Sequence, residues 1–116
     1  MLVLLFSTDS DLIDDVSDWC QYFGLKLVVS ESLRGWQASL DPADVLILDA
    51  DSIQGERVQN AQERVATWPR TVVVVQPEAA APGWVKPDWV LLRKPIGLKD
   101  FERLIGAELG QQSGQP

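Results

Sequence analysis

The chain has 116 residues, 46% of them hydrophobic and 23% charged, which is enough to build the core of one soluble domain. Its 17 acidic and 10 basic side chains give a net charge of −7, which argues against direct binding to nucleic acid. There is no histidine, so imidazole catalysis, histidine metal ligands and phosphohistidine are excluded. The single cysteine, Cys20, cannot form an internal disulfide, and no apolar stretch is long enough to span a membrane. With no signal peptide in view, we expect a cytoplasmic domain.

Five short apolar runs recur along the chain, and none alternates polar with apolar residues. This pattern predicts strands that are buried on both faces, as in a parallel sheet. The five predicted strands are Leu2–Phe6, Leu25–Val29, Val45–Leu48, Val72–Val75 and Trp89–Leu92.

Amphipathic segments separate most of these runs and predict helices. The predicted helices are Asp11–Phe23, Ser32–Leu40, Ile53–Trp68 and Leu98–Leu109. We expect the first helix to be capped by Thr8, Asp9 or Ser10 and to end at Gly24. The alternation of strands and helices predicts an α/β fold with a doubly wound parallel sheet.

The connection from residue 77 to residue 87 departs from this alternation. It contains three prolines, Pro77, Pro82 and Pro87, and proline breaks a helix interior. We therefore expect at most one helical turn there, around Glu78–Ala81.

The predicted domain comprises residues 1–109. Residues 110–116 are expected to be a polar tail or the start of a linker.

Two apolar strands deliver polar side chains at their carboxyl ends. The run Asp44–Asp49 ends in a carboxylate, and the run Trp89–Pro95 ends in Lys94-Pro95. Carboxyl ends of parallel strands converge on one crevice, so we expect Asp49 and Lys94 to be neighbours.

These two motifs resemble the receiver domains of bacterial two-component response regulators, and the element order matches over Met1–Leu109. The resemblance implies a flavodoxin-like, five-stranded parallel sheet in the order 2-1-3-4-5, here with helix four reduced or missing. It makes Asp49 the counterpart of the phosphoacceptor and Lys94 the counterpart of the lysine that contacts the acyl phosphate. It also makes the Lys94–Pro95 bond a candidate for the cis form.

Several positions depart from the receiver pattern. The acidic pair that holds Mg²⁺ in receivers is replaced by Ser7 and Thr8, with Asp9 one place later. The hydroxyl residue that senses the phosphoryl group is replaced by Gln76, and the aromatic switch residue by Leu91. Because Mg²⁺ needs several hard oxygen ligands, we expect no metal and no cofactor at this site.

We therefore predict a pseudo-receiver: a signalling and regulatory protein-interaction domain that works without phosphorylation and is not an enzyme. In that case Asp49 pairs with Lys94 or caps the next helix, and Asp51 caps the helix that begins near Ile53. The first alternative is a working receiver that accepts phosphate on Asp49 with Mg²⁺, where Asp51 could assist the metal. The second is a flavin or nucleotide carrier that uses the loop Ser7–Ser10.

Five tryptophans are more than a core of this size usually needs. We single out Trp84, Trp89 and Trp36 as candidate anchors for a protein partner or for self-association, possibly as a homodimer through the face from strand four to helix five. The alternative left open is that these rings cover the gap created by the missing helix.

Overall fold

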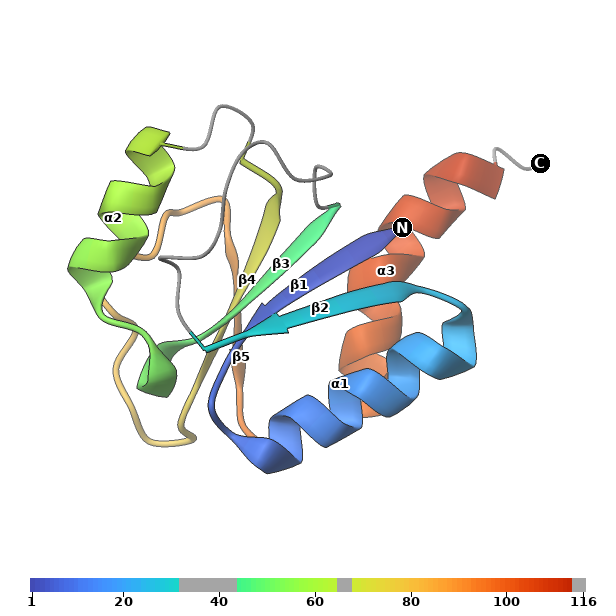
Figure 1. The fold of residues 1–116 in the computed structure, drawn as a ribbon, viewed down its shortest axis with the longest axis horizontal. Coiled ribbons are helices and arrows are strands. Elements are labelled where there is room, and N and C mark those ends of the chain that lie inside the picture. Colours follow the sequence, from blue (N-terminus) through green and yellow to red (C-terminus); the bar gives the residue numbers. More distant parts are fainter. Residues whose placement is uncertain (32–43, 65–67, 114–116) are drawn as a thin grey trace.

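The computed structural model describes residues 1–31, 44–64 and 68–113, and the side chains of residues 1–31, 44–63 and 68–106. Figure 1 shows the strands side by side in the middle of the molecule, with helices on both sides of them. The strands are β1 (Leu2–Phe6), β2 (Lys26–Ser30), β3 (Val45–Asp49), β4 (Arg70–Val75) and β5 (Val90–Arg93). The helices are α1 (Ser10–Phe23), the short 3₁₀ helix η2 (Ala50–Ser52), α2 (Gly55–Arg64) and α3 (Leu98–Ser113).

The five strands form one parallel sheet in the order β2-β1-β3-β4-β5. Strand β1 pairs with both β2 and β3, so that Leu4 lies between Val28 and Leu46. This confirms the predicted doubly wound sheet and its strand order. The carboxyl ends of β1, β3, β4 and β5 lie at the same edge of the sheet. Asp49 is the last residue of β3, and Ser7, Gln76 and Lys94 directly follow the other three strands.

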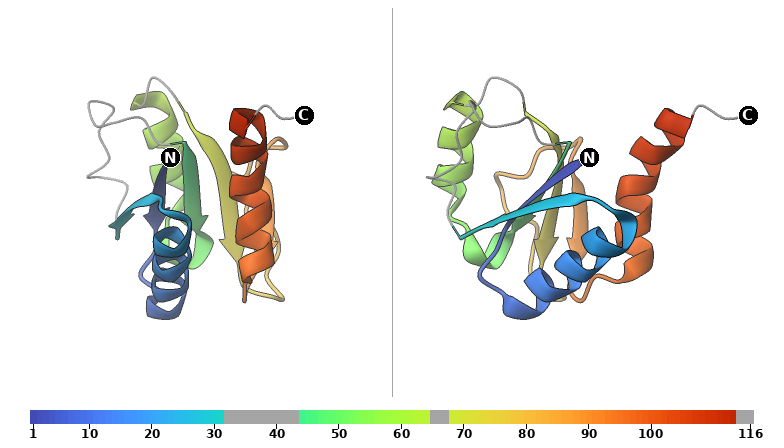
Figure 2. Two further views of the ribbon diagram at one scale, coloured as in Figure 1. Left: turned by 90° about the vertical axis from the view of Figure 1, so that its right-hand side faces the viewer. Right: turned by 45° about the vertical axis from the view of Figure 1, so that its right-hand side comes forward.

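Alternate side chains of the central strands point to the two faces of the sheet, and each face has its own hydrophobic core. On one face, Val3, Leu5 and Ile47 pack under α1 and α3. On the other face, Leu4, Phe6 and Leu48 pack against Val58 and Ala61 of α2. Figure 2 shows the same layers, with α1 and α3 together on one side and α2 on the other.

Helix α1 begins and ends at residues with clear capping geometry. The Asp9 side chain accepts hydrogen bonds from the backbone N–H groups of Asp11 and Leu12, at 3.0 and 3.3 Å. Gly24 adopts φ = 70°, a left-handed conformation that costs glycine little, and its N–H bonds back to the last turn of the helix. Both capping predictions are confirmed, and the start of α1 is thereby fixed next to the crevice.

The connection between β4 and β5 contains no helix, as its prolines predicted. Its conformation is fixed instead by Arg93, whose guanidinium Nη1 donates to the backbone oxygens of Gln76, Pro77 and Ala79 at 3.3, 3.2 and 2.6 Å. Farther along, the indole of Trp84 lies directly over Gly55 at the start of α2, where a β-carbon would stand 3.0 Å from Nε1 and closer still to Cδ1. The connection therefore packs where a helix would otherwise cover the sheet.

Several sequence predictions differ from the structure in detail. The expectation that every strand is buried on both faces is wrong for the two edge strands. In β2, Val28 and Val29 are 46% and 39% exposed, and no residue of β5 is fully buried. Helix α2 is shorter than predicted and begins at Gly55. Helix α3 continues to Ser113, past the expected end at Leu109. The predicted helix Ser32–Leu40 lies outside the described residues, as does Trp36.

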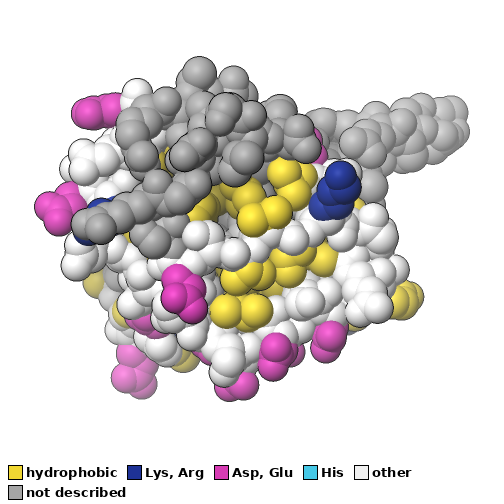
Figure 3. All heavy atoms as spheres, in the orientation of Figure 1, with side chains coloured by type: hydrophobic (Ala, Val, Ile, Leu, Met, Phe, Trp, Pro, Cys, Tyr) yellow, Lys and Arg dark blue, Asp and Glu magenta, His cyan; other side chains and the backbone are white. Residues whose placement is uncertain are grey.

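The surface reflects the acidic composition. Figure 3 shows hydrophobic side chains near the middle of the face that carries β2, with acidic side chains along the edge formed by α1.

Among the described residues, no helix is both long enough and apolar enough to cross a membrane.

Candidate functional site: the crevice at the carboxyl ends of the strands

Asp49 ends β3 with its side chain completely buried and fully hydrogen-bonded. Its Oδ2 accepts from the hydroxyls of Ser7 at 2.7 Å and Ser52 at 3.1 Å. Its Oδ1 accepts from the backbone N–H of Asp51 at 3.2 Å, which makes Asp49 the N-cap of η2. Both carboxylate oxygens are thus engaged before any cation is considered.

Lys94 supplies the cation of the crevice. Its ammonium lies 3.1 and 3.2 Å from the two oxygens of Asp49, 2.9 Å from Asp9 Oδ2 and 3.3 Å from Asp51 Oδ2. The Lys94 side chain is only 13% exposed, whereas Asp9 and Asp51 are 32% and 42% exposed. The predicted neighbourhood of Asp49 and Lys94 is therefore present, and two further carboxylates share the same ammonium.

The electrostatics follow from this arrangement. Burial alone disfavours the charged ammonium, but its hydrogen bonds to Asp9 and Asp49 outweigh that cost and raise the pKa of Lys94 to about 12. The hydrogen bond from Lys94 also holds the pKa of Asp9 below its ordinary value. The cis Lys94–Pro95 bond predicted from the resemblance is present and directly follows this lysine.

Hydroxyl groups connect β1 to the start of η2. Ser7 is fully buried, donates to Asp49 and accepts a hydrogen bond from the Asp9 N–H at 2.9 Å. Ser52 Oγ accepts from the Thr8 N–H at 2.9 Å and lies 3.0 Å from the Thr8 hydroxyl. Where receivers have an acidic pair, this chain has a hydroxyl network that supports a buried carboxylate.

Gln76 and Leu91, the residues at the two switch positions of the receiver pattern, lie in different environments: Gln76 is at the crevice and Leu91 is in the core. The Gln76 amide at the end of β4 donates to Asp51 Oδ2, so it is held against the acidic side of the crevice. Leu91 is in β5, half-buried, and packs in the core beneath α2 rather than into the crevice. The Asp51 carboxylate points to Lys94 and Gln76, and no described contact shows it capping α2.

The described residues do not fit a divalent metal well. Asp9, Asp49 and Asp51 converge on the Lys94 ammonium, and a metal ion placed among them would have to displace that cation. Over the described side chains of residues 1–31, 44–63 and 68–106, no three acidic or cysteine side chains are arranged to ligate one ion. The receiver-type Mg²⁺ site is therefore not formed by these side chains in this arrangement.

The candidate interface tryptophans Trp84 and Trp89 are both half-buried and pack on the core beneath α2. Their rings meet edge to face at a centroid distance of 6.4 Å, and Trp89 stacks on Trp68 at 5.9 Å.

Cys20 lies on the buried face of α1, and burial raises the pKa of its thiol to about 11.

Sequence reasoning gave no role here to two residues that shape this site. Ser52 donates to Asp49, and Arg93 fixes the connection that follows Gln76. Asp51, expected to cap the next helix or to assist a metal, instead shares the Lys94 ammonium. The position of Arg93 beside Lys94 at the end of a strand was the available signal, because both side chains had to emerge near the crevice.

The chain is similar in structure to several receiver domains. It matches a response regulator receiver protein from Burkholderia phymatum with a TM-score of 0.71 and 17% identity, covering 94% of each chain. It matches a CheY-like receiver domain from Methylobacillus flagellatus with a TM-score of 0.73 and 14% identity, covering 92% of this chain and 97% of the other. A CheY-like response regulator from Mesorhizobium loti gives 0.68 and 20% identity, with 90% and 95% covered.

No protein-family model and no curated protein sequence matches the chain. At these identities the similarity concerns the fold. Together with the strand order and the placement of Asp49 and Lys94, it shows that this chain has the fold of response regulator receiver domains.

Proposed function

We propose that this domain is a phosphorylation-independent regulatory module with a receiver fold, which acts by binding a protein partner or a second copy of itself. The observation that carries the proposal is the environment of Asp49. This carboxylate is fully buried, and its two oxygens already accept from two hydroxyls, one backbone N–H and the Lys94 ammonium.

Such an environment opposes phosphoryl transfer in two ways. A nucleophilic oxygen must be free to attack, and here each oxygen would first have to lose a hydrogen bond. The charge on the phosphoryl group must also be offset, and the Lys94 ammonium is already shared among three carboxylates. The crevice is therefore better suited to hold one conformation than to switch between two.

The competing function is a working receiver, and the retained pair of Asp49 and Lys94 favours it. Incubation with acetyl phosphate and Mg²⁺, followed by intact-mass measurement, decides between the two. We expect no phosphoryl adduct on the wild-type protein. An adduct that forms on wild type and is lost in Asp49→Ala would establish phosphorylation and overturn the proposal.

We propose that the regulatory contacts involve the face from β4 to α3, where a connection without a helix takes the place of the fourth helix of receiver domains. The rings of Trp84 and Trp89 stabilise that connection from beneath. Size-exclusion chromatography with light scattering at increasing concentration tests for self-association. We propose that the domain acts in the cytoplasm and that the contacts involve neither nucleic acid nor a membrane surface.

A further inference from the structure

The connection between β4 and β5 is built from three separate turns, and we call its residues 77–88 the strap. Each turn is closed by one backbone hydrogen bond. The N–H groups of Ala79, Val85 and Trp89 donate to the oxygens of Gln76, Pro82 and Lys86, at 3.1, 3.1 and 3.0 Å. Within the described part of the chain, the strap makes no other backbone–backbone hydrogen bond, so none ties it to a strand or to α2. Its backbone therefore does not hold it on the sheet.

Side-chain hydrogen bonds attach the strap through a single residue, Arg93. Its Nη1 donates to the oxygen of Gln76, just before the strap, and to the oxygens of Pro77 and Ala79 inside it. Three charged side chains of the strap are exposed and make no hydrogen bond or ion pair with any described residue: Glu78, Lys86 and Asp88. The Arg93 side chain is itself exposed and pairs with no described carboxylate, so water can replace the carbonyl oxygens that it holds.

Apolar contacts attach the strap through three side chains, Ala79, Trp84 and Val85, which pack on the core beneath α2. The indole of Trp84 lies directly over Gly55, and this is the closest approach of the strap to α2 that the glycine contacts record.

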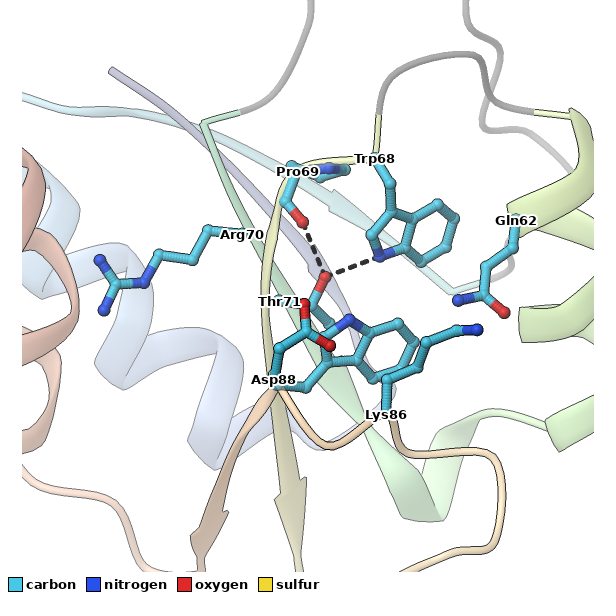
Figure 4. Close-up of a pocket in the computed structure, with 8 residues that line it drawn as sticks. Gln62, Trp68, Pro69, Arg70, Thr71, Lys86 and Asp88 are labelled. Atoms are coloured by element: carbon cyan, nitrogen blue, oxygen red, sulfur yellow. Dashed lines mark hydrogen bonds between the residues drawn. The ribbon is translucent and has the colours of Figure 1, made fainter.

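The end of the strap is separated from α2 by a pocket of about 480 Å³, which is lined by Gln62 of α2 and by Lys86 and Asp88. Figure 4 shows this pocket with hydrogen bonds around Thr71 only, and none joins Lys86 or Asp88 to Gln62. This end of the strap therefore has no polar contact with the helix beside it.

We propose that the strap opens as one unit while the rest of the domain stays folded, and that Arg93 and Trp84 are the two residues that hold it closed. A segment opens locally when it has few buried contacts and few hydrogen bonds to its surroundings. The strap places three side chains in the core and is bonded to the sheet by one guanidinium nitrogen. Opening breaks both attachments and leaves the sheet and its helices in place.

This inference deepens the proposed function and rests on it in one respect, the placement of the regulatory contacts on the face from β4 to α3. A closed strap packs the Trp84 indole into that face, whereas an open strap presents the indole and the Arg93 guanidinium to a partner. A partner that binds the open strap shifts the population toward it, so the face has two states without any phosphate chemistry.

Amide hydrogen exchange of the isotope-labelled domain, followed by NMR, tests the strap directly. The reporters are the turn N–H groups of Ala79, Val85 and Trp89, and amides of the central strands β3 and β4 report global unfolding. We expect the three turn amides to exchange through an opening that low urea concentrations barely change, whereas exchange in β3 and β4 should accelerate steeply with urea.

Two exposed arginines provide a matched pair of variants, because each substitution by glutamine removes one positive charge. Arg93→Gln should accelerate exchange of all three turn amides about tenfold, since the strap loses its charged donor. Arg103→Gln, on α3 and without a hydrogen bond or ion pair to any described residue, should leave the three rates unchanged.

Three results would overturn the proposal: equal acceleration in the two variants, acceleration of Ala79 alone, or turn amides that respond to urea as steeply as those of β3 and β4. Acceleration of Ala79 alone would mean that the strap does not open as a unit. The measurement involves neither phosphate nor a partner, so its failure leaves the intact-mass test of the proposed function standing.

Discussion

Replacing Lys94 by methionine tests the electrostatic organisation of the crevice. The pKa of this lysine rises from 10.5 to about 12, a shift of about 1.5, which corresponds to roughly 2 kcal/mol of stabilisation. Removing one partner of a buried ion pair costs about 3–5 kcal/mol, because the other charge stays buried and unpaired. Asp49 is fully buried, but Asp9 and Asp51 reach water and can be solvated. We therefore expect Lys94→Met to lower the free energy of unfolding by about 3 kcal/mol.

Urea denaturation followed by tryptophan fluorescence measures this loss. The control is the double variant Lys94→Met/Asp49→Asn, which removes both the cation and the buried charge while keeping a polar group for Ser7 and Ser52 to contact. We expect the double variant to recover at least about 1 kcal/mol relative to Lys94→Met alone. A loss below about 1 kcal/mol in Lys94→Met, or no recovery in the double variant, would refute the view that Lys94 neutralises a buried Asp49.

Three further predictions concern packing and titration. Gly55→Ala should destabilise the domain by about 1–3 kcal/mol, because the new methyl group meets the Trp84 indole. Gly106→Ala in α3 has open space and should stabilise the domain by up to about 1 kcal/mol. Thermal unfolding compares the two variants, and equal effects would contradict the packing of Trp84 on Gly55. Stability contributed by Lys94 is complete below pH 10.5 and lost as the pH rises through about 12, so urea titrations across this window should show a loss of roughly 2 kcal/mol that is absent in Lys94→Met. Cys20, buried and with its thiol pKa raised to about 11, should react with a thiol reagent only on unfolding; rapid labelling of the native protein would be the contrary result.

The architecture could be predicted because its signals are local and consistent. Continuous apolar runs separated by amphipathic segments require a parallel sheet covered on both faces, and this places Asp49 and Lys94 at one edge. The start of α1 could be placed at Thr8, Asp9 or Ser10 and its end at Gly24, because each cap needs only a side chain or a backbone conformation a few residues away.

The fine structure of the crevice could not be predicted, because it depends on the path of short turns. Asp51 was expected to cap the next helix, but η2 directs its carboxylate to Lys94 and Gln76. Ser52 is brought under Asp49 by the same turn. The exposure of the two edge strands could not be predicted either, because the apolar sequences of β2 and β5 do not reveal that these strands lie at the edges of the sheet.

The inference that a metal ion in this crevice would have to displace the Lys94 ammonium is tested most directly by a Mg²⁺ titration of the isotope-labelled protein. The signals to follow are the backbone amides from Asp49 to Ser52, which lie against the carboxylates concerned. We predict no saturable change at millimolar Mg²⁺. Saturable shifts of these amides that disappear in Asp49→Asn would mean that the ion displaces the ammonium, and would contradict the proposed phosphorylation-independent role.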